Sequence, residues 1–120
     1  MAKERGNYRE GYFATVAAAD AGLDTFVTAI DTRLDAIGTQ AITANGTIGM
    51  NVTAENAAGD EYTHRLSVSF DTGTVTAGTA LTHTIAIITA LGVLATAVEG
   101  ASDYTTVIEV SATANITMTN

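Results

Sequence analysis

Hydrophobic residues follow a helical period in the first third of the chain. Between residues 13 and 37 the large apolar side chains recur three and four positions apart, which places them on one face of a helix. These residues are Leu23, Phe26, Val27, Ile30, Leu34 and Ile37. Gly22 predicts a division into a short helix and a longer one, and Gly38 predicts the end of the longer helix.

From Ala41 onward the hydrophobic period changes to two. Apolar and polar residues alternate over 46–54 and again over 62–70, as they do in strands with one buried face. The inward positions are Ile48, Met50 and Val52 in the first run and Leu66, Val68 and Phe70 in the second. A cluster of turn residues over 55–60 separates the two runs, so they predict an antiparallel β-hairpin.

A second helix is predicted over 79–99, after a loop over 71–78, and a final strand over 104–118. The apolar surface of this helix is wider than one stripe, which predicts burial on more than one side. Residues 80–98 have the length of a membrane span. Because they include His83 and four threonines and have no flanking cations, we predict a buried core or interface helix instead.

The first twelve residues carry mixed charges and contain no apolar run. They predict an extended N-terminal arm (1–12) in front of a single domain (13–120). The predicted fold class is α+β. Its order is an N-terminal extended arm, a helix, an antiparallel β-hairpin, an apolar helix and a C-terminal strand, with the helices packed on one sheet face.

Charge is scarce and unevenly distributed along the chain. Of the 120 residues, 15% are charged and 47% are hydrophobic, and the formal net charge is −8. Three of the five cations lie within the first nine residues, and the remainder is acidic. Affinity for nucleic acid depends on clustered cations, so this composition argues against a nucleic-acid-binding protein. The low charge also predicts that other subunits cover part of the surface.

One short string has the form of a catalytic motif. Phe70-Asp71-Thr72-Gly73 resembles the hydrophobic-Asp-Thr-Gly signature of aspartic proteases. The resemblance implies an active site shared by two chains, in which one aspartate from each acts as acid or base. The match covers these four residues only. The competing interpretation is a turn at the end of a strand, stabilised by local hydrogen bonds of Asp71.

Three other patterns predict neither a cofactor nor a metal site. Residues 73–79 have the glycine spacing of a phosphate-binding loop, but no Lys precedes Thr79. His64 and His83 lack the spacing of a metal site. An acidic stripe on the first helix is interpreted as a solvated face, with binding of a cation or of a neighbour's basic arm left open. The stripe consists of Asp20, Asp24, Asp31 and Asp35.

The order helix, hairpin, helix, strand, with residues 60–70 as the second hairpin strand, is similar to that of tail-terminator and tail-completion proteins of tailed bacteriophages. Those are small α+β subunits that form rings at the head–tail junction. The chain also resembles capsid decoration proteins, which are small, low in charge, rich in Thr and Ala, and oligomeric. The resemblance implies a non-enzymatic structural subunit of a bacteriophage virion, of the homo-oligomeric capsid decoration (cement) type. A head–tail junction ring protein is the alternative in the same class, and a dimeric aspartic protease is the alternative in another.

The arm supplies the predicted contact residues, because Arg and aromatic side chains anchor interfaces more often than other residues. These candidates are Lys3, Arg5, Tyr8, Arg9 and Tyr12. The predicted partners are other copies of the chain and a capsid or other virion protein, with no nucleic acid, membrane or cofactor. The second helix and its facing strands are predicted to form the contact between copies.

Overall fold

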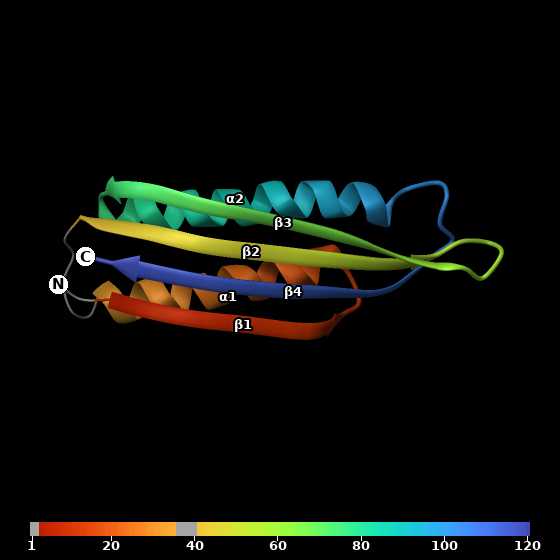
Figure 1. The fold of residues 1–120 in the computed structure, drawn as a ribbon, viewed down its shortest axis with the longest axis horizontal. Helices are drawn as coiled ribbons and strands as arrows, with labels where there is room; N and C mark the ends of the chain where they lie inside the picture. The colour runs from red at the N-terminus through yellow and green to blue at the C-terminus, as the bar shows by residue number, and fades with distance from the viewer. Residues whose placement is uncertain (1–2, 36–40) are drawn as a thin grey trace.

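The computed structural model describes residues 3–35 and 41–120. Within these ranges, four strands and two helices form an elongated molecule with extents of 55 × 19 × 17 Å (Figure 1). The elements are β1 (Lys3–Phe13), α1 (Val16–Asp35), β2 (Ile42–Glu55), β3 (Glu61–Val75), α2 (Ala77–Glu99) and β4 (Thr106–Thr119).

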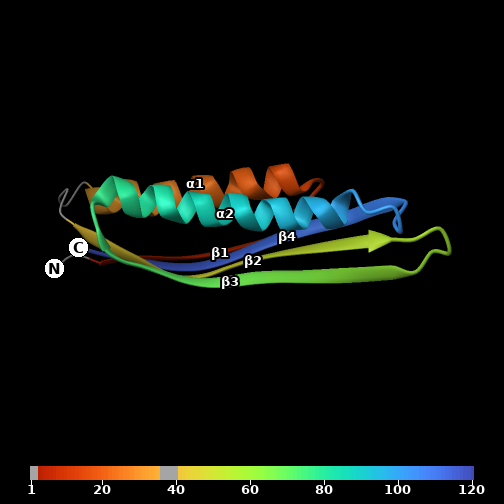
Figure 2. The same ribbon diagram turned by 90° about the horizontal axis from the view of Figure 1, so that it is seen from above.

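The strands form one antiparallel sheet in the order β1-β4-β2-β3. β2 and β3 are the two strands of a hairpin, and the C-terminal strand β4 pairs with both β1 and β2. Both helices lie on the same side of this sheet, and no helix or strand among the described residues covers the opposite side (Figure 2). The predicted α+β class, with both helices on one sheet face, is therefore confirmed.

The core lies between the sheet and the helices and follows from the two hydrophobic periods. Alternate residues of β2, and of β4 from Val110 onward, point toward the helices and are buried. α1 contributes one buried stripe at helical spacing. The largest buried side chains come from both layers and include Leu23, Ile30, Leu34, Ile48, Met50, Ile88 and Met118.

One close approach within the sheet requires glycine. Gly46 lies in β2 with a φ of +148°, and a Cβ at this position would lie 1.9 Å from the carbonyl oxygen of Asn115. Beside it, the pairing of β2 with β3 is irregular, and the amide of Ala44 donates to the hydroxyl of Thr72 at 3.0 Å. A side chain thus replaces the backbone acceptor where the ladder is interrupted.

The N-terminal residues require a correction. They are extended, but Lys3–Phe13 is the edge strand β1 and not an arm. It pairs with β4 from Lys3 opposite Thr119 to Phe13 opposite Val110. The prediction of a separate arm is wrong because charged residues alternate here with residues that face α1. A Cβ at Gly6, for example, would lie 2.7 Å from Cζ of Phe26, so the strand packs closely on the helix.

Two further boundaries differ from the prediction. α1 continues through Gly22 without a break. This glycine allows close packing instead, because a Cβ there would lie 2.7 Å from the hydroxyl of Tyr8. β3 and α2 together occupy most of the predicted loop over 71–78. The predicted helix end at Gly38 lies outside the described residues.

Candidate interaction surfaces

α2 packs on the rest of the protein through one side only. It contacts α1, β2 and β3. Its fully buried side chains recur three or four positions apart, as expected for one helical face; they include Ala80, Thr84, Ile88 and Ala95. The hydroxyl of Thr84 donates to the carbonyl oxygen of Ala80 at 2.9 Å, so this polar group is satisfied within the core.

The outer face of α2 is exposed and carries no formal charge, and large apolar side chains lie among its small residues. Val93 and Leu94 are 66% and 59% exposed, and no Lys, Arg, Asp or Glu occurs in the helix before Glu99. Among the described residues, α2 is the one helix long and apolar enough to cross a membrane. Of its most apolar 18-residue stretch, 28% is buried in the protein. Since its inner face forms part of the core, the helix combines a core face with an open apolar face.

An apolar groove of about 300 Å³ lies where α2 meets the edge strand β3. It is lined by Ser67, Val68, Ile87, Ala90, Leu91 and Leu94. Ile87 and Leu94 lie outside the main apolar stripe of the helix, and they account for the extra width of the apolar surface predicted from the sequence. The extra width therefore does not lie under the sheet, but continues the exposed face of α2 around its edge.

Three of the five predicted contact residues are accessible on the side of the sheet away from the helices. Lys3, Arg5 and Arg9 are exposed and alternate along β1 with residues that face α1. None of them forms an ion pair within the described part of the chain, where the one salt bridge joins Arg33 to Glu4 at 3.2 Å. All three cations are therefore available to an external partner.

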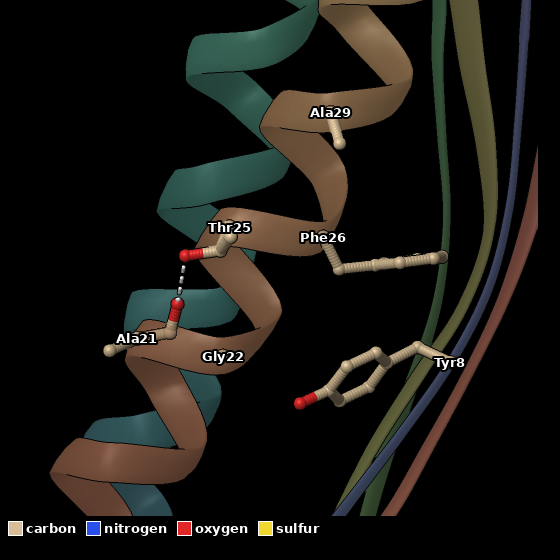
Figure 3. Close-up of a pocket in the computed structure, with 6 residues that line it drawn as sticks. All are labelled: Tyr8, Ala21, Gly22, Thr25, Phe26 and Ala29. Atoms are coloured by element: carbon tan, nitrogen blue, oxygen red, sulfur yellow. Dashed lines mark hydrogen bonds between the residues drawn. The ribbon is translucent and has the colours of Figure 1, made fainter.

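The two predicted tyrosines have different surroundings. Tyr8 points from β1 toward α1, and its ring centroid lies 5.2 Å from that of Phe26 (Figure 3). Burial, with a smaller contribution from the charge of Glu10, raises the pKa of the Tyr8 hydroxyl. The shallow groove around it is completed by Ala21, Gly22, Thr25 and Ala29. Tyr8 thus fixes β1 against α1, whereas Tyr12 is 77% exposed.

A further open surface is the side of the sheet away from the helices, here called the free sheet face (Figure 2). Small uncharged residues dominate its centre, because they occupy the strand positions that alternate with the core residues. Across β4 and β2, register pairs on this face include Thr117 with Asn45, Asn115 with Thr47, and Ser111 with Asn51. Between β2 and β3, the hydroxyls of Thr53 and Thr63 lie 2.9 Å apart. In the sequence, this surface can be recognised from the polar residues that alternate with the apolar ones along each strand.

The acidic stripe of α1 is not solvated throughout. Asp31 is 6% exposed, and one carboxylate oxygen of each of Asp20, Asp24 and Asp31 is buried without a hydrogen-bond partner in the described part of the protein. Asp20 lies against α2, since a Cβ added to Gly92 would lie 2.7 Å from its Oδ2. Burial raises the pKa of all three carboxyls, and the charge of a neighbouring aspartate raises it further at Asp20 and Asp31.

The remaining candidate residues make local contacts. Oδ1 of Asp71 accepts a hydrogen bond from the amide of Gly73 at 2.8 Å. The predicted local bond therefore forms, but both residues lie within β3, beside its irregularity, and not in a turn at the end of the strand. Nε2 of His64 lies 2.5 Å from the hydroxyl of Tyr104, and His83 is exposed on α2. Over residues 3–35 and 41–120, no three His or carboxylate side chains are grouped so that they could hold a metal ion.

Three features are therefore candidates for a functional role. They are the outer face of α2 with its groove, the free sheet face, and the partly buried carboxylates of α1. Comparison of the chain with protein-family models and with curated proteins finds no match.

Proposed function

We propose that the chain is a non-enzymatic structural subunit of a bacteriophage virion, of the homo-oligomeric capsid decoration type. The outer face of α2 is the main support for this proposal. A helix that covers a sheet in a solitary protein normally presents charged or polar residues to water. α2 instead exposes Val93 and Leu94 beside an apolar groove, and an exposed apolar patch of this kind is typical of an interaction site.

Burial of this face would contribute favourably to association between copies. Complete burial of a Val or Leu side chain contributes about 1.5–3 kcal/mol, and Val93 and Leu94 are each more than half exposed. Two copies that meet through α2 would bury four such side chains. Their burial would contribute roughly 4 kcal/mol or more, before the groove beside Leu94 is counted.

The composition and the other surfaces fit a subunit that is surrounded by protein in a particle. Only 15% of residues are charged, and the free sheet face offers a second broad contact surface. The tether formed by residues 1–12 is not retained, because β1 is part of the sheet. Lys3, Arg5, Arg9 and Tyr12 remain candidate contacts with a capsid protein. A ring subunit at the head–tail junction is the alternative within this class.

Measurement of molar mass by light scattering tests the association step. At high salt, where contacts between charges are screened, the wild-type protein is expected to be oligomeric and Leu94→Glu to be monomeric. Tyr62→Glu is the matched control, because Tyr62 is 48% exposed but lies at the hairpin end, away from α2. Circular dichroism would establish that each variant is folded. A wild-type protein that stays monomeric at high concentration would refute the structural role.

The class of protein is tested separately. Under the proposal, the protein is found at fixed stoichiometry in purified phage particles, on the capsid rather than at the neck. Cleavage of a peptide library that is abolished by Asp71→Asn would instead establish the dimeric protease. Asn keeps an acceptor for the amide of Gly73, so this variant tests the carboxyl group without removing the local hydrogen bond.

A further inference from the structure

We propose that the free sheet face is a second self-association surface, on which another copy of the chain packs antiparallel across a two-fold axis. This contact is distinct from the one through α2. It deepens the proposed function by giving the assembly subunit a second partner surface, and that surface has a different chemistry. The proposal follows from the placement of charges on the strands.

The charges on β3 are self-complementary. Arg65 lies opposite Asn51 of β2, and Asp71 lies opposite Asn45. The rows of this face run from Thr43 to Thr53, so Arg65 and Asp71 lie one row inside opposite ends of it. A two-fold axis through the centre of the face, perpendicular to the strands, therefore places Arg65 of each copy against Asp71 of the other. Within one copy the two residues are six positions apart on one strand, about 20 Å, and cannot meet.

One cation of β1 agrees with this antiparallel arrangement. Lys3 lies in the row of Thr43, and Glu109 lies in the row of Thr53 at the opposite end. The same two-fold axis brings Lys3 of one copy to the row of Glu109 of the second copy, whereas Arg5 and Arg9, in the rows of Asn45 and Gly49, do not reach that row. Within the described residues none of these cations has an ion-pair partner of its own.

The alternative face-to-face arrangement is unfavourable. A two-fold axis parallel to the strands would place the hairpin ends of two copies together. Glu55, Glu61 and Glu109 are near each other at that end, so six carboxylates would face one another, with Arg65 one row further along the strands. That axis also places β1 over β3 and brings Arg5 to Asp71, because both lie in the row of Asn45, but the cluster of like charges costs affinity and disfavours this arrangement.

The composition of the face suits a small protein–protein contact. The rows from Thr43 to Thr53 run about 34 Å along the strands and the molecule is 19 Å wide, so the face measures on the order of 600 Å², somewhat below the roughly 800 Å² that a stable interface buries per partner. Between the rows of Arg65 and Asp71 the surface consists of Thr, Ser, Asn and Gly, apart from Arg9 on the edge strand β1. These small residues lose little solvation on burial compared with charged side chains. The charge pairs set the orientation, and the small residues allow the two sheets to approach.

Charge reversal tests the contact in a Leu94→Glu background, in which the contact through α2 is removed. Sedimentation should show dimers at about 20 mM salt that dissociate at about 500 mM, because exposed charge pairs are screened. Arg65→Glu alone and Asp71→Arg alone should each weaken dimerisation by about tenfold or more, because each puts two like-charged pairs in the interface. The double variant Arg65→Glu/Asp71→Arg should dimerise as the parent does.

Mixing the two single variants gives the sharpest result. The Arg65→Glu copy carries only negative charge at these sites and the Asp71→Arg copy only positive charge, so the mixture should form heterodimers although each variant alone is monomeric. No contact within one chain explains such a rescue. Failure of the mixture and of the double variant to dimerise would overturn the proposal. If Asp71→Arg does not fold, a double-mutant cycle with Asp71→Asn and Arg65→Gln takes its place. Additive effects of the two substitutions on the dimerisation constant would then also overturn the proposal.

Two controls separate this inference from neighbouring ones. Wild-type oligomers that persist at high salt but are abolished by Leu94→Glu report on α2 alone, so the two contacts can fail independently. A Leu94→Glu protein that stays monomeric at low salt yet binds heparin or single-stranded DNA through Lys3, Arg5 and Arg9 would show that the free sheet face serves an anionic polymer instead, and would overturn the proposal.

Discussion

Neutralising the buried carboxylate of Asp31 should make the protein more stable at neutral pH. Asp31 lies on α1 and is 6% exposed, and its Oδ1 is buried without a hydrogen-bond partner in the described structure. Burial raises the pKa of Asp31, and the charge of Asp35, one turn further along the helix, raises it further. Asp31→Asn keeps the shape of the side chain, and the new amide donates to the carboxylate of Asp35 without needing a proton.

The expected gain can be bounded from these contacts. An unsatisfied polar group in a buried position costs about 1–3 kcal/mol. Asn leaves part of that cost in place because its own oxygen stays buried, so a gain of about 1 kcal/mol is expected, or about 4 °C in Tm for a domain of this size. The sign follows from the raised pKa of Asp31. The folded state holds the proton more tightly than the unfolded state, so this group favours folding at low pH and that contribution is lost as pH rises through the folded-state pKa.

Urea unfolding followed by circular dichroism at about pH 7.5 and about pH 4.5 measures the effect. The gain from Asp31→Asn should be present at the higher pH and smaller at the lower pH, where the wild-type carboxyl begins to be protonated. Asp103→Asn is the matched control, because Asp103 is exposed in a turn, and its effect should stay within about 0.5 kcal/mol. A loss of stability in Asp31→Asn, or an equal gain at both pH values, would refute the reasoning.

Two further substitutions test how the elements are held together. A carboxylate oxygen of Glu99 accepts a hydrogen bond from the amide of Val16 at 2.9 Å, at the N-terminus of α1; Glu99→Ala should cost about 1–2 kcal/mol and Glu99→Gln less, because the carboxylate also interacts with the helix dipole. Thermal unfolding should give the highest Tm for the wild type, a lower one for Glu99→Gln and the lowest for Glu99→Ala. An unchanged Tm in Glu99→Ala would contradict this role. Gly46→Ala should destabilise by more than about 3 kcal/mol, because its Cβ would lie 1.9 Å from the carbonyl oxygen of Asn115. Soluble, folded Gly46→Ala of wild-type stability would show that the strands can separate locally at no cost.

The elements that could be predicted are those whose burial has one regular period. Alternation over 46–54 and 62–70 predicted the hairpin because each strand has one face in the core. β1 escaped prediction because its inward positions include Gly6 and Tyr8 rather than a run of aliphatic residues, and its outward positions are charged. The glycine is needed for close packing on α1, so the same feature that lets the strand dock hides it from a hydrophobicity pattern.

The interaction surfaces were predictable only in part, for a related reason. The exposed cations of β1 and the width of the apolar face of α2 could be found from residue type. The burial of Asp31 could not, because it depends on how α1 packs in the folded protein. The same is true of Arg65 and Asp71, whose complementary placement follows from strand register and not from their separation in the sequence.

The arrangement of the two proposed contacts has a consequence for assembly. The outer face of α2 lies in the helix layer, and the free sheet face lies on the opposite side of the sheet (Figure 2). One copy can therefore use both surfaces at once. If each contact joins two copies across a two-fold axis, either contact alone stops at a dimer, and alternation of the two extends the assembly into a ring or a chain. Leu94→Glu should then leave dimers that depend on charge, and Arg65→Glu should leave oligomers that resist salt. The wild-type protein at low salt should form larger species than either variant.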